Sequence, residues 1–222
     1  MPFDLEYGRR VYDRTSRHPR LYALIRWSVC LGRESGLQQL AIDALNLQSG
    51  QTVLDLACGN GVNFKHLAAI IGQRGKIFAL DYSTGMLANA QRHAASHGLP
   101  NFQFIHADAA RVCLKPNSLD AALCTFGLSA MPGERHAIQN VARALKPGAR
   151  FVVFDAKPFT GLARIWNPIL GPFFARTQNW NPHKDVVKAL RENFTQVNLR
   201  QFNSGCNFIA VAAKPAYSDS HK

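Results

Sequence analysis

The strongest chemical signal in this 222-residue chain is a carboxylate that stands just before a glycine turn. In the run VLDLACGNG, Asp55 precedes Gly59 and Gly61. Residues 52–57 predict a buried parallel strand, and residues 62–72 predict an amphipathic helix. The two glycines permit a tight turn and let a ligand approach the backbone closely. A strand, a glycine turn and a helix in this order predict a site for a nucleotide-like ligand at the carboxyl end of a sheet.

The residues of the turn restrict the kind of ligand. A dinucleotide-binding turn needs a small residue at the third position of G-x-G-x-x-G/A, where this chain has Phe64. A Walker A loop is absent, because no Gly-Lys-Ser/Thr follows the turn. The carboxylate of Asp55 is an unfavourable neighbour for a pyrophosphate and a favourable one for a cation. A ligand that carries an ammonium group therefore fits the turn better than a dinucleotide.

The turn also matches a known pattern, D/E-x-x-x-G-x-G. On these residues the segment resembles motif I of the class I S-adenosylmethionine (SAM)-dependent methyltransferases. The resemblance implies S-adenosyl-L-methionine as the cofactor. It also implies that the turn contributes cofactor-binding residues, which are Asp55, Ala57, Gly59, Asn60 and Gly61.

A second carboxylate ends the next predicted strand, over residues 76–81. Asp81 lies 20 residues after Gly61, and an acid at this position can accept both hydroxyls of a ribose in charge-assisted hydrogen bonds. The run YSTGML that follows it is similar to a motif of the ubiquinone/menaquinone-type methyltransferases. That likeness implies that Tyr82 and Met86 flank the adenine ring.

Further segments match the same family in the same order. The run FQFIHADA resembles the third-strand motif, which implies that Asp108, next to Ala109, receives the adenine amino group. The run SLDAALCTF resembles the fourth strand, and Phe126 at its end joins the cofactor-binding residues. Each segment alone has a simpler interpretation, such as a turn, a helix stop or a helix cap at Ser83. Their order and spacing across residues 50–155 favour SAM binding.

Strands and helices are predicted to alternate, which indicates a mostly parallel sheet covered on both faces. Only a short turn joins the last two predicted strands, so they should form an antiparallel hairpin. The predicted fold is therefore α/β, with a Rossmann-like seven-stranded sheet, one antiparallel C-terminal hairpin and helices on both faces. Predicted strands cover residues 52–57, 76–81, 102–106, 119–125, 150–155, 194–200 and 206–213. Predicted helices lie near residues 62–72, 84–97, 134–145 and 184–193.

Two segments lie outside this scaffold and should hold the substrate. Residues 1–50 predict one or two helices, which we interpret as a helical cap. Residues 157–180 form an aromatic-rich insertion, which is either part of the core or, as we favour, the wall of an acceptor pocket and a substrate lid. The SAM-binding domain is expected over residues 51–214 and a flexible tail over residues 215–222.

One residue of the cap is the candidate catalytic residue. In the family that the chain resembles, an N-terminal Tyr-Asp element folds over the methionine part of SAM, and Tyr12 matches it. No argument from residue spacing supports His18 or His136 as a catalytic residue. Methyl transfer depends mainly on positioning and charge placement, so the sequence identifies no general base.

Basic residues outnumber acidic ones, 26 Lys and Arg against 14 Asp and Glu, which gives a formal net charge of +12. Many arginines fall within residues 1–33, with tyrosines and a tryptophan between them. Such a face can lie on an anionic membrane, bind nucleic acid through its phosphates, or simply be solvated. Solvation and membrane contact are favoured, and nucleic acid is the least favoured partner.

The sequence also bears on compartment. No uncharged apolar stretch reaches the length of a membrane span, and the acidic start does not match a secretory signal. Five scattered cysteines without a Cys-x-x-Cys pair indicate reduced thiols and give no reason to expect a metal. These features predict a cytoplasmic protein, with any contact to the inner face of the membrane being peripheral.

A second resemblance concerns the substrate. The runs YDRT, LGRE and FGLSAMP are similar to bacterial methyltransferases that act on amino head groups of lipids, of the diacylglyceryl-homoserine and phosphatidylethanolamine types. It implies N-methylation of a lipid-linked or small amine at a membrane surface. One alternative is C- or O-methylation of a quinone precursor or secondary metabolite. Another is a non-catalytic, SAM-binding regulatory or nucleic-acid-binding module.

Overall fold

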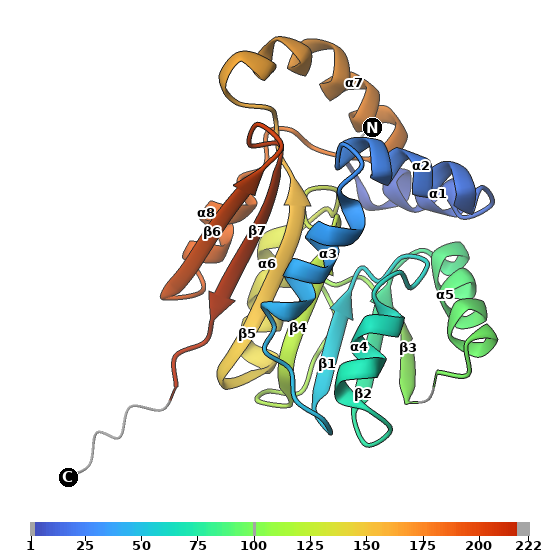
Figure 1. The fold of residues 1–222 in the computed structure, drawn as a ribbon, viewed down its shortest axis with the longest axis vertical. Coiled ribbons are helices and arrows are strands. Elements are labelled where there is room, and N and C mark those ends of the chain that lie inside the picture. The colour runs from blue at the N-terminus through green and yellow to red at the C-terminus, as the bar shows by residue number, and fades with distance from the viewer. Residues whose placement is uncertain (1–2, 100, 217–222) are drawn as a thin grey trace.

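The computed structural model describes residues 3–99 and 101–216 and contains one seven-stranded sheet (Figure 1). The strand order is β3-β2-β1-β4-β5-β7-β6. The five strands from β3 to β5 pair in parallel, and β7 is antiparallel to both of its neighbours. This is the predicted Rossmann-like sheet with its C-terminal hairpin. The strands are β1 Thr52–Leu56, β2 Lys76–Asp81, β3 Phe102–His106, β4 Leu119–Thr125, β5 Leu145–Ala156, β6 Gln196–Phe202 and β7 Asn207–Ala213.

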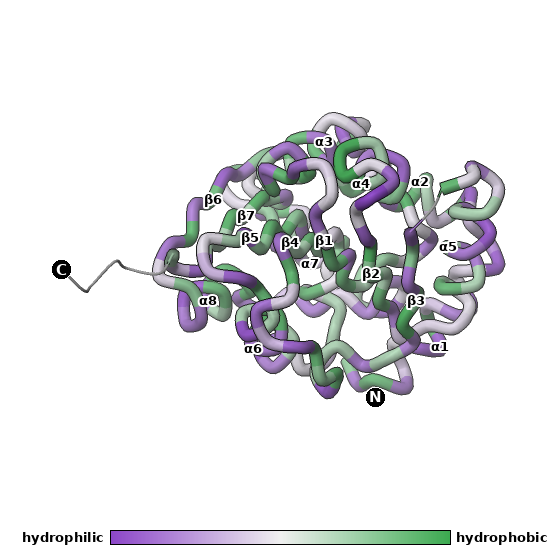
Figure 2. Tube along the Cα trace, turned by 90° about the horizontal axis from the view of Figure 1, so that it is seen from below, coloured by the Kyte–Doolittle hydropathy of each residue, from purple (hydrophilic) through white to green (hydrophobic). Residues whose placement is uncertain are grey.

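Helices cover both faces of the sheet, as predicted. Seen from below, α3 and α4 lie on one side of the strands and α6 and α8 on the other (Figure 2). Helix α5 packs beside α4 at the β3 edge through Phe64, Leu87 and Ala90. The helices of this layer are α3 Glu34–Asp43, α4 Phe64–Ile71, α5 Thr84–Ser96, α6 Glu134–Ala144 and α8 Val186–Arg191.

The central strands are buried on both faces, which explains their apolar runs. In β1, Val53 packs with the α3/α4 cluster and Leu54 with the α6/α8 cluster, because successive side chains point to opposite faces. Both side chains are fully buried. A strand covered on both sides reads as a continuous apolar run, so β1, β2 and β4 were predictable from sequence.

The bounds of some elements differ from the prediction. Strand β5 begins at Leu145, not at residue 150, because Leu145 pairs with Leu119 before a register shift. Strand β6 covers Gln196–Phe202, two residues later than predicted. The predicted cap of α5 is confirmed, since the Ser83 hydroxyl accepts a hydrogen bond from the Met86 amide at 3.1 Å.

The N-terminal segment contains three helices where one or two were predicted. They are α1 Leu5–Thr15, α2 Pro19–Val29 and α3. The first break falls before Pro19, whose fixed φ suits the start of a helix. The second falls at Leu31 and Gly32, which have left-handed φ values of 50° and 78°. Only α3 packs on the sheet, so α1 and α2 are free to cover the carboxyl ends of the strands.

Residues 157–180 contain a 3-10 helix, η1 Gly161–Trp166, and helix α7 Asn167–Gln178. Both lie beyond the carboxyl ends of the strands, on the same side as α1 and α2 (Figure 1). Two hydrogen bonds join α1 to the end of α7: Tyr7 Oη donates to the Arg176 carbonyl at 3.0 Å, and Tyr12 Oη donates to the Gln178 carbonyl at 2.9 Å. Within the described residues no helix has the length and apolar character to cross a membrane. Of the predicted tail, residues 217–222 lie outside the described part of the chain.

Candidate cofactor and acceptor sites

The glycine turn after β1 is built from residues in the left-handed region. Ala57, Gly59 and Gly61 have φ values of 55°, 55° and 82°. At Gly61 an added Cβ would lie 2.6 Å from the Phe64 ring, so this position needs glycine for space as well as for φ. At Gly59 an added Cβ would meet no atom within 4 Å, so the space beside the turn is open to a ligand. Phe64 packs under the turn, where a dinucleotide-binding turn has a small residue.

Asp81 joins the tip of β2 to the turn. Its carboxylate accepts hydrogen bonds from the Gly59 amide at 2.8 Å and the Ser83 amide at 2.9 Å. Burial raises the pKa of Asp81 to about 6, against the lowering effect of these amides. Each carboxylate oxygen retains a lone pair, so Asp81 can still accept hydrogen bonds from a diol.

Asp55 lies beneath the turn and not in it, which corrects the expectation that its carboxylate meets a cationic ligand directly. The Asn63 amide group donates to both Asp55 oxygens, at 3.0 and 3.2 Å. Asn63 in turn accepts from Gln38 Nε2 at 2.6 Å. Asp55 is fully buried, and this burial raises its pKa to about 7. The carboxylate therefore fixes Asn63 at the start of α4 and acts on a ligand only through that contact.

The remaining predicted cofactor residues gather at the tips of β2 and β3. The Tyr82 hydroxyl is one of three buried side-chain polar atoms without a hydrogen-bond partner among the described residues. Met86 is buried, and Asp108 accepts from the Ala110 amide at 2.9 Å. Ala109 packs in the core, where its carbonyl accepts from Asn140, so its side chain does not face the turn.

Arg26 is a site residue that the sequence did not assign. Helix α2 places its guanidinium over the turn, where Nε bonds Glu34 at 2.6 Å and Nη1 donates to Asn60 at 3.3 Å. The guanidinium also lies 4.7 Å from the centre of the Tyr22 ring. A cavity of about 20 Å³ separates α2 from the turn. In the sequence, Arg26 is the one charged residue in the apolar stretch from Leu21 to Leu31, and this feature could have indicated a role in the site.

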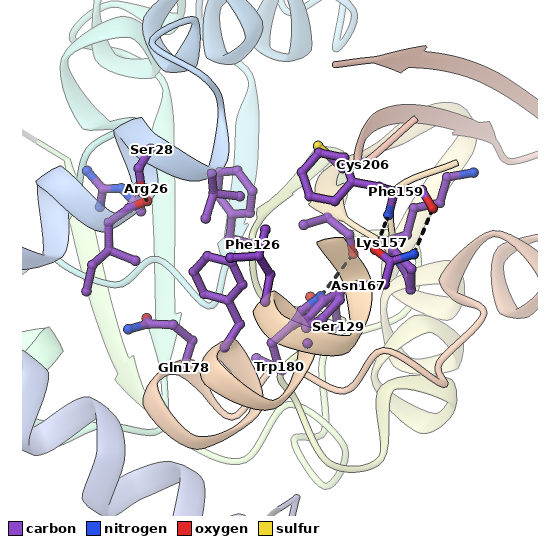
Figure 3. A pocket seen from close by; sticks show the side chains of 18 of the residues that line it. Arg26, Ser28, Phe126, Ser129, Lys157, Phe159, Asn167, Gln178, Trp180 and Cys206 are labelled. Atoms are coloured by element: carbon purple, nitrogen blue, oxygen red, sulfur yellow. Dashed lines mark hydrogen bonds between the residues drawn. The ribbon is translucent and has the colours of Figure 1, made fainter. Parts of the chain in front are cut away.

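A second cavity, of about 230 Å³, lies between α2, α7 and the ends of β4 and β5 (Figure 3). Tyr22, Arg26 and Phe126 line both cavities and form the boundary between them. The walls are mainly aromatic and aliphatic, which is typical of a small-molecule site. They include Tyr12, Ile25, Val29, Leu31, Phe159, Leu170, Phe174 and Trp180.

Few polar groups face this second cavity. No Asp or Glu is among its lining residues in the described part of the chain, whereas Arg26 and Lys157 are. Ser129 also lines it, and its hydroxyl donates to Asp155 at 2.6 Å while its amide donates to the same carboxylate at 2.9 Å. Asp155 is fully buried, and burial raises its pKa above the usual carboxyl value.

The candidate catalytic residue and the two histidines named in the sequence lie in different surroundings. Tyr12 lines the second cavity, but its hydroxyl donates to the Gln178 carbonyl, and burial raises its pKa well above 10. Its hydroxyl is therefore held protonated against the end of α7, and its role as the catalytic residue stays a prediction. His18 and His136 are exposed. Asp13, next to Tyr12, accepts from Ser83 Oγ at 2.6 Å and the Gly85 amide at 3.2 Å, and so joins α1 to the start of α5.

Comparison with known proteins identifies the family. A family model described as a methyltransferase domain matches residues 53–148. Demethylmenaquinone methyltransferase of Geobacillus stearothermophilus is 24% identical over 217 residues, which are 95% of this chain and 92% of the relative. The chain is a SAM-dependent methyltransferase, and it is similar to those of the ubiquinone/menaquinone type.

Other relatives agree with this methyltransferase family. The 2-phytyl-1,4-naphtoquinone methyltransferase of Nostoc sp. is 30% identical over 148 residues, 66% of this chain and 63% of that protein. A SAM-dependent methyltransferase structure from Aquifex aeolicus has a TM-score of 0.61 at 20% identity, over 79% of this chain and 88% of that one. The structure of phosphoethanolamine N-methyltransferase 2 of Haemonchus contortus has a TM-score of 0.67 at 15% identity, over 80% of this chain and 52% of that one. These two structures share the fold.

The residues around the turn of this methyltransferase suit its cofactor, SAM. The cofactor carries a ribose diol, an adenine and an amino acid. The site offers a carboxylate acceptor at Asp81, a guanidinium at Arg26 that is paired with Glu34, and open space beside Gly59.

Proposed function

We propose that this methyltransferase transfers the methyl group of SAM to a carbon or oxygen of a lipophilic phenol or quinol bound in the 230 Å³ cavity. The supporting observation is the charge of its lining, which includes Lys157, an Arg26 paired with Glu34, and no carboxylate among the described residues. An amine approaches a site mostly as an ammonium, which these cations disfavour. An aromatic acceptor with a hydroxyl group suits both the aromatic walls and the cations.

The names of the relatives support the same acceptor class, because two of them act on demethylmenaquinone and 2-phytyl-1,4-naphthoquinone by name. N-methylation of a lipid-linked or small amine, expected from the second sequence resemblance, remains a second candidate. The N-methyltransferase neighbour supports it only at the level of fold. A non-catalytic SAM-binding module is a third outcome that the experiment below separates.

We assign the cofactor contacts residue by residue. Asp81 accepts the ribose hydroxyls, Arg26 pairs with the methionine carboxylate, and Asp108 accepts from the adenine amino group. Tyr82 and Met86 flank the adenine. When bound, SAM supplies a methyl group on a positively charged sulfur, which an electron-rich carbon or oxygen displaces in line.

The proton of the acceptor hydroxyl needs a base. We assign this role to the pair of Ser129 and Asp155, since Ser129 lines the cavity and donates to Asp155. The acceptor hydroxyl gives its proton to Ser129 Oγ as the Ser129 proton moves to Asp155. The electron pair left on the oxygen then attacks the methyl group directly or through a ring carbon. In the second case the C–H bond of that carbon breaks afterwards and its proton returns to the oxygen, which restores the aromatic ring. The raised pKa of Asp155 favours retention of the proton.

The test is a methyl-transfer assay with labelled SAM and three separate acceptors in detergent: a demethylnaphthoquinol with a short prenyl chain, phosphatidylethanolamine and phosphoethanolamine. We expect label in the naphthoquinol only, and none with Asp81→Asn. Label in either amine but not in the naphthoquinol would overturn the assignment. If S-adenosylhomocysteine binds by calorimetry but no acceptor is labelled in this assay or with a total metabolite extract, the non-catalytic alternative is correct.

A further inference from the structure

Large apolar side chains are exposed almost only on the two segments that cover the second cavity. Ten such side chains are exposed among the described residues, and nine belong to residues 21–31 and 162–173. The exception is Leu40 on α3, which is 39% exposed and is the least exposed of the ten. Surface apolar residues scattered singly need no explanation, but a concentration on two neighbouring helices marks an interaction surface.

Helix α2 has two apolar faces with different surroundings. Its inner face, with Tyr22, Ile25 and Val29, lines the second cavity. Its outer face exposes Leu21, Leu24 and Trp27, each between 55% and 58% exposed, and Leu31 after the helix is 60% exposed and also lines the cavity. Their spacing of three or four residues places them along one side of the helix. No residue of α2 is fully buried, so core packing does not account for these side chains.

The η1/α7 segment repeats this arrangement. Asn167, Leu170 and Phe174 line the cavity. The other side exposes five apolar residues at helical spacing: Leu162, Ile165, Trp166, Ile169 and Phe173. Leu162 is 94% exposed. The two outer faces therefore flank one apolar cavity, whose walls are their inner faces.

The charges around these faces have one sign. No acidic residue occurs between Asp13 and Glu34, a stretch with five arginines. None occurs between Asp155 and Asp185, a stretch with two arginines and two lysines. Exposed members of these stretches are Arg14, Arg17, Arg20, Arg33, Arg164 and Arg176. Apolar side chains bordered by arginines, without carboxylates, complement an anionic phospholipid surface.

We infer that the outer faces of α2 and of η1/α7 dock the protein on an anionic phospholipid bilayer. We call them the outer surface. Trp27 and Trp166 suit the interface between lipid and water, and the arginines contact lipid phosphates. The benefit of docking rests on the proposed function: a lipophilic acceptor could pass from the bilayer between α2 and α7 into the cavity. Docking itself does not require that function and is measured without any acceptor.

The experiment is co-sedimentation of the full chain with vesicles of phosphatidylcholine alone or with added phosphatidylglycerol. The main variant combines Leu162→Ser, Ile165→Ser and Ile169→Ser, and its matched control is Leu40→Ser. A second variant combines Arg17→Glu and Arg20→Glu, matched by Arg74→Glu with Arg191→Glu. Both control arginines are exposed; Arg74 precedes β2 and Arg191 ends α8.

We expect partition into anionic vesicles to fall about tenfold or more in each outer-surface variant and to change little in each control. Wild-type partition should also weaken in high salt. S-adenosylhomocysteine affinity, measured by calorimetry, should stay unchanged in all variants, which shows that they are folded.

Three outcomes would overturn the inference. One is no partition of the wild type into either vesicle. Another is equal partition of the wild type and the triple serine variant. The third is a dimer in solution that the triple variant dissociates, with no vesicle binding, because the outer surface would then hold a second copy. The methyl-transfer assay in detergent contains no bilayer, so failure of docking and failure of the proposed function are distinguishable.

Discussion

Asp81 connects three parts of the site at the residue scale, because one carboxylate holds the turn, the start of α5 and, in our assignment, the ribose. Replacement by Asn keeps the size of the side chain but removes the charge of the acceptor. We expect Asp81→Asn to weaken S-adenosylhomocysteine binding about tenfold or more, since hydrogen bonds to charged groups contribute about 1.5–3 kcal/mol. Calorimetry measures this affinity, and Asp43→Asn, at an exposed position on α3, is the control. Equal affinities would exclude the ribose role.

Asp55 makes stability depend on pH. Its pKa is raised to about 7 in the folded chain, against about 4 for an unfolded Asp. The folded chain therefore binds the Asp55 proton more tightly, so the contribution of Asp55 to stability is greatest at low pH and is lost as pH rises through the folded pKa. We expect wild type to lose up to about 3 kcal/mol more than Asp55→Asn between pH 5 and 8. Urea unfolding at pH 5 and pH 8 measures the free energy of unfolding of both proteins. Equal losses in wild type and Asp55→Asn would contradict the prediction.

The pair of Ser129 and Asp155 determines the pH dependence of activity in our mechanism. Because Asp155 must be ionised to receive a proton, activity should rise with pH through an apparent pKa above the usual carboxyl range. Asp155→Asn should remove this limb and lower kcat about a hundredfold, the lower range of general-base effects. S-adenosylhomocysteine affinity controls for folding. A pH profile shared by wild type and variant would show that the base lies elsewhere.

At the scale of elements, the contact between α1 and α5 depends on Asp13. An added Cβ at Gly85 would collide with Ser16, so the two helices meet closely there. We expect Asp13→Ala to accelerate amide hydrogen exchange in residues 5–15 about tenfold, because two hydrogen bonds to a carboxylate are lost. Strand β1 should stay protected, since its core contacts are elsewhere. Glu6→Gln is the exposed control, and equal exchange in both variants would reject the role.

The sheet and the helices on its faces were predictable, and the number and bounds of the helices over the strand ends were not, for a physical reason. Strands such as β1 are buried on both faces, so their sequences are mostly apolar. Helix α2 has no buried residue, and its sequence divides apolar side chains between a cavity and the surface. Such a helix lacks the single apolar face that fixes bounds and orientation.

Within the site, local motifs were predictable and distant pairs were not. The turn and Asp81 follow the strand ends in sequence, so their positions could be inferred. The contacts of Arg26 with Asn60, and of Tyr12 with Gln178, join residues 34 and 166 positions apart and appear only in the folded chain. The sequence also suggested that Asp55 contacts the ligand. The hydrogen bonds between Asn63 and Asp55 beneath the turn are visible only in the folded chain.

At the scale of the whole molecule, the site is enclosed by segments from both ends of the chain. Helices α1 and α2 cover it from one side, and η1 and α7 from the other (Figure 1). The cavity between the turn and α2 is small, about 20 Å³. Helix α2 lies directly over the turn, where Arg26 donates a hydrogen bond to Asn60.

That closed arrangement has a consequence for turnover. Because α2 lies over the turn, we expect it to open to admit SAM and again to release S-adenosylhomocysteine, and we expect product release to limit the steady-state rate. We expect a rapid burst of one methylated product per enzyme in stopped or quenched flow, followed by a slower linear phase. Added viscogen should slow only the linear phase, and a trideuteromethyl label on SAM should leave kcat unchanged. A lag in place of the burst, or a full isotope effect on kcat, would place the slow step in the chemistry. If product release limits the rate, anionic vesicles that hold α2 against lipid should change the rate of the linear phase alone.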